Sequence, residues 1–314
     1  MNNSDIYIEN YLTQMCPNKL MVLEMVKKAL LVGINDYAPI GAGGPDLRGC
    51  VNDVRDMATT LRDLGIVPAN PAVMHIFTDG RATRAAILGE LNWLVKGAKK
   101  GDLLIFYYSG HGSQMPDLTG EEPDKKDETI CPHDFATAGM IKDDDMRGIF
   151  AGIPAGVNLE VILDSCHSGT GTREQAALCG EGIPEEERVT IRYVEPPFDY
   201  AFFLEDPTLS SRRLLKSSPD LMNADMARAP VIVSLNHVLW AGCKDNQTSG
   251  EATVGGVVRG FFTYCFCKCL RSKMGNISRL DLDKCVTSCL KGVGAGQTPQ
   301  LEGTKPTMLE KVFT

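Results

Sequence analysis

The sequence predicts an α/β fold, a three-layer sandwich in which a mostly parallel sheet of about six strands carries helices on both faces. Short segments that are almost entirely apolar, at 28–34, 102–108 and 159–163, are typical of strands buried on both faces. Between the first two of them, residues 51–64 and 83–95 repeat apolar side chains at helical spacing. Strands that alternate with helices favour parallel pairing through helical crossovers, which gives this fold class.

The first half of the chain supplies most of the predicted sheet. A Gly/Pro-rich loop follows strand 28–34 and leads into helix 51–64. Thr83 suits the N-cap of helix 83–95, because its hydroxyl can accept from a backbone N–H that the first turn leaves without a partner. Three further elements are expected here: a strand at 73–77, a hairpin arm at 129–131 and one or two helical turns at 146–150.

The second half contains a long insertion. We expect a leader at 1–27 and a single domain at 28–314, whose parts are 28–175, an irregular insertion at 176–228 and a C-terminal part at 229–314. A loop of this length inside a compact domain is usually functional or disordered. After it we expect strands at 230–235 and 237–241, helices at 253–270 and 278–291, and a last strand at 308–313.

Composition limits the classes of function. The 314 residues carry a net charge of −8 and no basic stripe, so nucleic acid is not the expected partner. The N-terminus lacks the pattern of a signal peptide, and no apolar run is long enough to cross a membrane. Eleven cysteines, an odd number, favour reduced thiols and a cytoplasmic protein.

Two of the predicted strands end in residues that can do chemistry. Strand 102–108 is followed by Ser-Gly-His111-Gly, and strand 159–163 by Asp-Ser-Cys166. Because the carboxyl ends of parallel strands meet at one edge of a sheet, we expect His111 and Cys166 to face each other across one crevice. A thiol and an imidazole held in this way form a cysteine nucleophile with its acid/base partner. His167 should point away from the thiol, since adjacent side chains alternate along extended backbone.

These motifs identify a family. Tyr107-Tyr-Ser-Gly-His-Gly112 and Asp164-Ser-Cys-His-Ser-Gly169 resemble the metacaspases, the caspase-like cysteine peptidases of clan CD, with a bacterial or protist type among the options. The resemblance covers about 28–175 and 228–305, and it implies a caspase-like sandwich and a monomer. Five further segments match in the order of the family: 49–54, 127–132, 143–145, 242–249 and 297–301.

The resemblance implies a Cys166/His111 dyad without a fixed third carboxylate. His111 would protonate the departing amine. The backbone N–H groups of Gly112 and Cys166 would hold the oxyanion of the reaction, an interaction of the kind that typically contributes about 2.7–4 kcal/mol per donor.

The resemblance also implies a pocket for a basic residue. Asp53 and Asp164 match acidic positions that line the pocket for the residue before the cleaved bond, and Ser109 matches a further lining position. Two carboxylates there would select Arg or Lys by charge-assisted hydrogen bonds, so the expected partners are proteins or peptides with those residues before the cut. Glu251 stands where the family often has aspartate, and its longer side chain would shift its reach.

Asp127, Asp143 and Asp144 offer hard oxygen ligands of the kind that Ca²⁺ prefers. A run of acidic residues is more often a solvated face. The matching aspartates bind calcium in calcium-activated metacaspases, so the resemblance implies Ca²⁺ as the cofactor.

An enzyme that cuts after basic residues should also cut itself in a long insertion that contains them, because proteolysis concentrates in exposed segments. The first candidates are Arg212, Arg213 and Lys216, which cluster beside serines, and the next are Arg188 and Arg192.

Three cysteines at 265, 267 and 269 and two at 285 and 289 invite a zinc hypothesis. None of these pairs has the two-residue spacing of a zinc knuckle, so thiols that pack between helices are the favoured interpretation.

The sequence thus predicts a calcium-dependent cysteine endopeptidase. Two alternatives stay open: a caspase-fold binding module that has lost catalysis, and a cysteine hydrolase that acts on a small acyl substrate.

Overall fold

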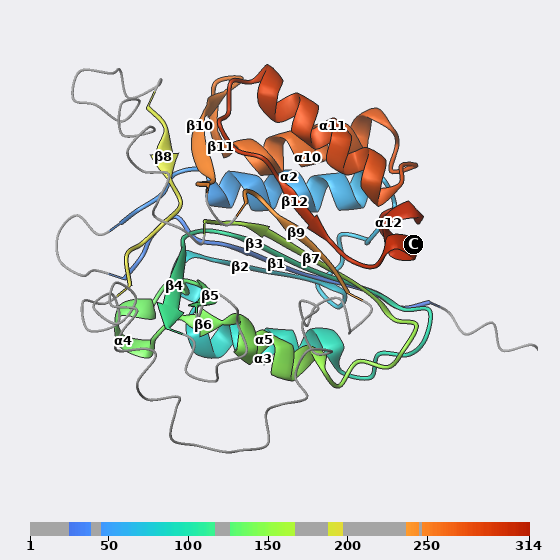
Figure 1. Ribbon diagram of the computed structural model, residues 1–314. Helices are drawn as coiled ribbons and strands as arrows, with labels where there is room; N and C mark the ends of the chain where they lie inside the picture. The colour runs from blue at the N-terminus through green and yellow to red at the C-terminus, as the bar shows by residue number, and fades with distance from the viewer. Residues whose placement is uncertain (1–24, 39–44, 117–125, 167–187, 197–236, 245–246) are drawn as a thin grey trace, which may run out of the picture.

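A six-stranded sheet lies at the centre of the computed structural model, which describes residues 25–38, 45–116, 126–166, 188–196, 237–244 and 247–314. The strand order is β12-β9-β7-β3-β1-β2, and within it β12 alone runs antiparallel to its neighbour (Figure 1). The expected fold class, a mostly parallel sheet, is confirmed. The strands are β1 (Lys27–Gly33), β2 (Met74–Thr78), β3 (Leu103–Ser109), β7 (Asn158–Asp164), β9 (His237–Ala241) and β12 (Gln300–Glu302).

Helices cover both faces of this sheet (Figure 1). On one face lie α2 (Cys50–Asp63), α10 (Phe261–Ser272) and α11 (Arg279–Gly292), and on the other lie α3 (Arg84–Val95) and α5 (Asp143–Phe150). Side chains of β1 alternate between the two layers, with Ala29 and Leu31 in the first core and Leu30 and Val32 in the second. Burial on both faces explains why the central strands are apolar almost throughout.

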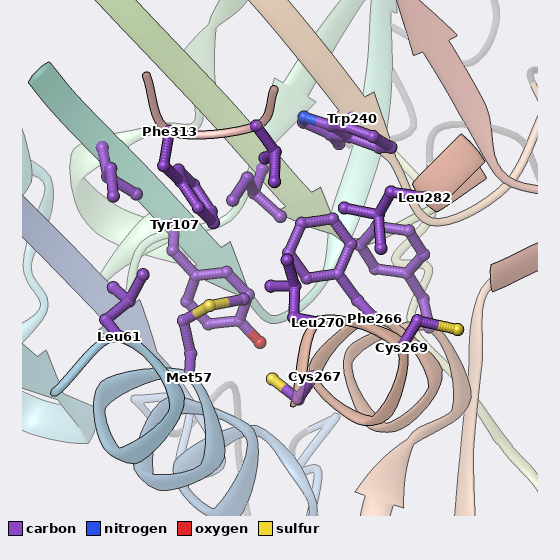
Figure 2. Packing of buried hydrophobic residues seen from close by; sticks show 14 of the residues in the cluster. Met57, Leu61, Tyr107, Trp240, Phe266, Cys267, Cys269, Leu270, Leu282 and Phe313 are labelled. Carbon is purple, nitrogen blue, oxygen red and sulfur yellow. The ribbon is translucent and has the colours of Figure 1, made fainter. Parts of the chain in front are cut away.

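The larger core lies between the sheet and α2, α10 and α11. Figure 2 shows Met57 and Leu61 of α2 packed towards Tyr107 of β3, with Phe266 and Leu270 of α10 beside them. Each large side chain that is fully buried in this way stabilises the fold by roughly 1.5–3 kcal/mol.

Two small sheets stand at the carboxyl edge of the central one. The first consists of β4 (Gly112–Pro116), β5 (Lys126–Ile130) and β6 (Ile141–Lys142), so the arm expected at 129–131 is the end of β5. The second consists of β8 (Thr190–Ile191), β10 (Gly250–Val254) and β11 (Val257–Gly260). Figure 1 shows the chain of β8 running from β10 towards β4.

The helix predicted at 253–270 is wrong in its first part. Residues 250–260 form the β10–β11 hairpin, and the helix begins at Phe261. Gly255 and Gly256 have φ values of 63° and 80°, the conformation of a two-residue hairpin turn. A glycine pair between apolar residues is the sequence signal for such a hairpin.

The last predicted strand, 308–313, is also wrong. The edge strand is β12, which pairs with β9, and the short helix α12 (Lys305–Leu309) follows it. Pro306 favours the first turn of a helix because its φ is preset and no N–H is needed there. The predicted strand at 230–235 lies outside the described residues, as do residues 1–24 of the leader and most of the insertion.

The predicted helix starts at Thr83 and Ser278 are confirmed. The Thr83 hydroxyl accepts from Ala86 N at 3.3 Å, and the Ser278 hydroxyl accepts from Asp281 N at 3.1 Å.

Two short elements complete the described structure, a 3₁₀ turn at Asp79–Arg81 and α4 (Phe135–Ala138). Among the described residues, none of the helices combines the length and apolar character that a membrane span requires.

Two disulfides join α10 to α11, Cys265–Cys289 and Cys269–Cys285. The expectation of reduced, packing thiols is therefore wrong for these four residues, whereas Cys267 is a buried free thiol. Residues four apart share one face of a helix, so two antiparallel helices can align two such pairs at once. Within the described residues no cluster of possible metal ligands forms, so the structure offers no support for zinc there.

Candidate active site

The two motif-bearing strands are neighbours. β3 and β7 pair in parallel, with Ser109 opposite Asp164. His111 and Cys166 each lie two residues after this pair, so both are at the same edge of the sheet. A Cβ on Gly112 would overlap the carbonyl oxygen of Cys166, which shows how closely the two loops approach. Glycine at 112 thus permits the contact between the two segments.

The hydrogen bonds of His111 assign its tautomer. The imidazole is 3 % exposed, and Nε2 lies 2.6 Å from the carbonyl oxygen of Pro45. A carbonyl only accepts, so Nε2 carries the hydrogen and Nδ1 is the basic nitrogen. Nδ1 is buried and has no hydrogen-bond partner among the described residues. Burial lowers the pKa of His111 to about 4, although the Pro45 carbonyl opposes this shift, so the ring is neutral near pH 7.

Cys166 is fully buried at the end of β7. Its thiol donates to the carbonyl oxygen of Ser249 at 2.9 Å, and the backbone N–H of Ser249 points at the sulfur. The backbone N–H groups of Gly112 and Cys166 converge on one oxygen, the carbonyl of Arg192, at 3.0 and 3.2 Å. The predicted pair of oxyanion donors therefore holds a carbonyl of this same chain.

The guanidinium of Arg192 fills the predicted pocket. Nη2 lies 2.6 Å from Asp53 Oδ2, and Nη1 lies 3.0 Å from Asp164 Oδ2. Nη1 also donates to the Ser109 hydroxyl at 2.9 Å. All three residues named for the pocket thus surround one fully buried arginine.

Glu251 adds a third carboxylate that sequence reasoning did not assign to the pocket. Its Oε2 lies 3.2 Å from Nη2 of Arg192, and the backbone N–H groups of Arg48 and Gly49 hold the carboxylate in place. The extra length of Glu over Asp, noted from the sequence, was the available signal. A Cβ on Gly260 would lie 2.6 Å from Nη1, so a glycine in that wall leaves room for the guanidinium.

The pKa values of Asp53 and Arg192 reflect their burial next to each other. Burial raises the pKa of Asp53 to about 6, while Arg192 opposes the shift and Asp164 adds to it. Burial alone would lower the pKa of Arg192, but the negative charges around it, with Asp164 first and then Asp53 and Glu251, raise it well above its ordinary value. Three acidic side chains without a cation would repel one another, so the pocket favours a basic occupant.

The candidate calcium ligands lie on β5 and at the start of α5. Asp127 is buried and pairs with Lys142 Nζ at 2.5 Å, while Asp143 and Asp144 both pair with Arg147. In the described part of the chain these residues do not form a cluster that could hold a metal ion. In this arrangement Lys142 and Arg147 neutralise the three carboxylates.

The candidates for self-cleavage separate into two groups. Arg212, Arg213 and Lys216 lie outside the described residues, whereas Arg188 and Arg192 lie within them. Arg188 is exposed and Arg192 is fully buried.

Comparisons with known proteins place this chain in a family. Residues 27–173 match the metacaspase, peptidase C14 domain. Metacaspase-1 of Cryptococcus neoformans is 35% identical over 89% of this chain and 63% of its own length. Metacaspase-1B of Aspergillus oryzae is 35% identical over 91% of this chain and 70% of its own. The chain thus spans about half to seven-tenths of the length of such relatives, which are fungal and give no support to a bacterial or protist type.

Solved structures share the fold. A protein of Geobacter sulfurreducens superposes with a TM-score of 0.63 at 25% identity, covering 92% of this chain and 98% of its own. Caspase-1 of Spodoptera frugiperda superposes with a TM-score of 0.54 at 13% identity, covering 92% of this chain and 90% of its own. The expected caspase-like sandwich is therefore confirmed. With relatives this similar over most of both chains, the chain belongs to the metacaspases, the peptidase C14 family of cysteine peptidases.

Proposed function

We propose that this protein is a cysteine endopeptidase that cleaves protein chains after Arg or Lys, depends on calcium and processes itself. One observation carries the proposal: the side chain of Arg192 lies in an acidic pocket while its carbonyl oxygen accepts from Gly112 N and Cys166 N. A basic side chain and the carbonyl that follows it are thus bound together beside a thiol, as a substrate for cleavage after arginine must be.

The residues of the site suit acyl transfer. Cys166 loses its proton and attacks the carbonyl carbon of the basic residue. The backbone N–H groups of Gly112 and Cys166 stabilise the oxyanion, and loss of one such donor typically costs about 2.7–4 kcal/mol in barrier. His111 Nδ1, the basic nitrogen of the assigned tautomer, carries the proton to the departing amine, and the Pro45 carbonyl keeps the ring oriented.

The Cys166 thiol must first leave its hydrogen bond to Ser249. In the structure this thiol donates to Ser249 O, so the sulfur must turn away from that carbonyl before it attacks. Such contacts commonly rearrange when the reactive complex forms. Ser249 also donates through its hydroxyl to Asp164 at 2.7 Å, which links the thiol contact to the pocket wall.

Specificity follows from the pocket charge. Neutralising Asp53 or Asp164 would leave a guanidinium partly unpaired in a site closed to water, and unpaired buried charges cost several kcal/mol. Reporters with Arg or Lys before the cut should therefore be the good ones, and Asp reporters should fail.

Calcium dependence rests on the oxygen donors of Asp127, Asp143 and Asp144 and on the family. The antiparallel β5–β6 pairing sets Thr129 opposite Lys142, which brings the strand of Asp127 beside the start of α5. Calcium binding would require Lys142 and Arg147 to release these carboxylates.

Hydrolysis of short peptide reporters that end in Arg, Lys or Asp, with and without calcium, tests the function. Arg and Lys reporters should be cut, and a basic peptidyl electrophile should label Cys166 alone. The Cys166→Ala variant should be inactive. Activity that survives in that variant would overturn the assignment of the nucleophile.

The same assay separates the alternatives. A silent binding module would neither hydrolyse reporters nor react with the electrophile. A hydrolase of small acyl substrates would react without a preference for a basic residue, which the three buried carboxylates argue against.

A further inference from the structure

The segment Val189–Val194 lies in the cleft as an extended strand. On one side of Arg192, Thr190 and Ile191 pair antiparallel with Glu251 and Gly250 of β10. Addition of a strand to an exposed sheet edge is a common way to bind an extended peptide, because main-chain hydrogen bonds hold it regardless of sequence.

Both sides of the Arg192–Tyr193 bond are held. Before the bond, Arg192 N donates to Ser249 O at 3.0 Å. After it, Val194 N donates to Gly112 O at 3.0 Å, and Tyr193 bridges to Gly112 in parallel. The peptide bond is thus fixed between β10 and β4, and the carbonyl of Arg192 lies at the oxyanion donors.

We infer that the Arg192–Tyr193 bond is the protein's own processing bond, and that the uncut segment Val189–Val194 keeps the pocket closed to other substrates. This inference rests on the proposed function. It assigns the regulation of that site to one tethered segment of the chain.

The chemical step is an ordinary acyl transfer. Cys166 Sγ forms a bond to the carbonyl carbon of Arg192, and the bond from that carbon to the nitrogen of Tyr193 breaks. The proton of the thiol passes through His111 to the nitrogen of Tyr193, which becomes a new N-terminus. Water then adds to the thioester, restores the Cys166 thiol and leaves a carboxylate on Arg192.

Charge and burial single out Arg192 among the described basic residues of the insertion. Arg188, four residues earlier, is exposed, whereas the guanidinium of Arg192 is fully buried against three carboxylates. Because a bonded occupant fills the pocket, another substrate can enter only after Arg192 has left it. Cleavage breaks the covalent link between Arg192 and Tyr193, so the part of the segment that ends at Arg192 can leave the pocket.

Mass spectrometry of the purified full chain, sampled over time with calcium, tests the bond. We expect two fragments, one ending at Arg192 and one starting at Tyr193. Arg192→Gln should abolish this cut, whereas the matched control Arg188→Gln should keep it. The rate of wild-type cleavage should not depend on protein concentration, because the segment is already bound in its own cleft.

Reporter kinetics test the closed pocket. Wild-type protein should show a lag that ends as the Arg192–Tyr193 cut completes. Uncut Arg192→Gln protein should hydrolyse an Arg reporter without a lag, initially about tenfold or more faster than uncut wild type, since a tethered competitor acts at an effective concentration in the mM range. Arg188→Gln should keep the wild-type lag.

Three results would overturn the inference. Full reporter hydrolysis by an intact chain would show that the segment neither blocks the pocket nor is cut. Cleavage at Arg212, Arg213 or Lys216 with the Arg192–Tyr193 bond intact would place processing elsewhere. Failure of every variant to hydrolyse any basic reporter would overturn the proposed function itself, and the inference with it.

Discussion

At the scale of single residues, the pocket is a balance of buried charges. Asp53, Asp164 and Glu251 are all fully buried, and Arg192 is the cation among them. A planar guanidinium presents several donors in a fixed fork and can meet carboxylates on two sides, whereas an ammonium is a point charge. The third carboxylate therefore favours Arg over Lys.

Glu251→Gln should reduce cleavage of Arg reporters more than of Lys reporters. Loss of one hydrogen bond between charged groups typically costs about 1.5–3 kcal/mol, or roughly tenfold to a hundredfold in kcat/KM. The measurement is kcat/KM for paired Arg and Lys reporters. Asp56→Asn is the matched control, because Asp56 pairs with Arg259 rather than with the pocket occupant. Equal losses for both reporters would contradict a role of Glu251 in choosing arginine.

The pH profile should reveal Asp53. Its pKa is raised to about 6 by burial, and Arg192 holds it below the value that an empty pocket would give. Protonation removes the negative charge that binds the basic side chain, so activity must fall as the pH drops. The acid limb of kcat/KM, which reports the free enzyme, should therefore have its midpoint at or above about pH 6.

The acid limb expected from Asp53 can be told apart from one set by His111, because the two groups have different pKa values. Burial, with a smaller contribution from Arg192, lowers the pKa of His111 to about 4, so a limb set by the dyad alone should appear below that of Asp53. In Asp53→Asn the limb near pH 6 should disappear from the remaining activity. A wild-type midpoint near 4 would contradict the assignment to Asp53.

At the scale of elements, α10 is a shared wall of the core and of the site. Its first residues follow Gly260, whose N–H donates to Asp53, and the Thr263 hydroxyl donates to Asp164 at 2.6 Å. Its other face is tied to α11 by both disulfides. The disulfides therefore hold in place a helix that positions two pocket carboxylates.

Reduction of the disulfides should lower the melting temperature by several degrees. They close nested segments of 24 and 16 residues, and a single loop of this size stabilises by about 3 kcal/mol in the chain-entropy model. Thermal unfolding with and without dithiothreitol measures the effect. The Cys265→Ser/Cys269→Ser double variant is the control and should not respond to the reductant. An equal response of variant and wild type would contradict the pairing.

At the scale of the whole molecule, the chain after Arg192 supplies half of the site. It contributes β9 beside β7, the Ser249 contact to Cys166 and helix α10 against α2. A buried ion pair between Arg279 of α11 and Glu160 of β7 joins the same two parts at 2.6 Å. Neither part can therefore form the pocket alone.

Fragments produced by the cut at Arg192 should stay together as one particle. The five-residue parallel register of β7 and β9 and the packing of α10 on α2 join the fragments. Size-exclusion chromatography of processed protein should give one peak that contains both fragments, and denaturant should separate them. Two peaks under native conditions would contradict this account.

Calcium should control the activity of the whole molecule. A chelator should abolish hydrolysis, and calcium but not magnesium should restore it, because magnesium demands strict octahedral geometry and releases water reluctantly. Asp144→Asn should raise the calcium concentration required, whereas Asp63→Asn on the exposed side of α2 should not. Full activity in chelator would show that Asp127, Asp143 and Asp144 only pair with Lys142 and Arg147.

Much of the fold could be predicted from local patterns. Apolar segments predicted the central strands, and a side-chain cap predicted the start of the helix after Thr83. The errors fell where local signals competed. The apolar residues of 250–260 suit a helix or a hairpin, and the choice depended on pairing with β8 and on the glycine turn. Glu160 lies in a strand that sequence reasoning treated as apolar, and it is tolerated because Arg279 neutralises it.

The positions of His111 and Cys166 at one edge of the sheet could be predicted from sequence, because parallel strands bring their carboxyl ends together. Which basic residue lies in the pocket depended on tertiary contacts. Asp53, Glu251 and Arg192 are far apart in the chain, and no periodicity relates them. Only the β8–β10 pairing and the closing of two loops around Cys166 bring them together, since such contacts depend on three-dimensional packing and leave no local pattern in the sequence.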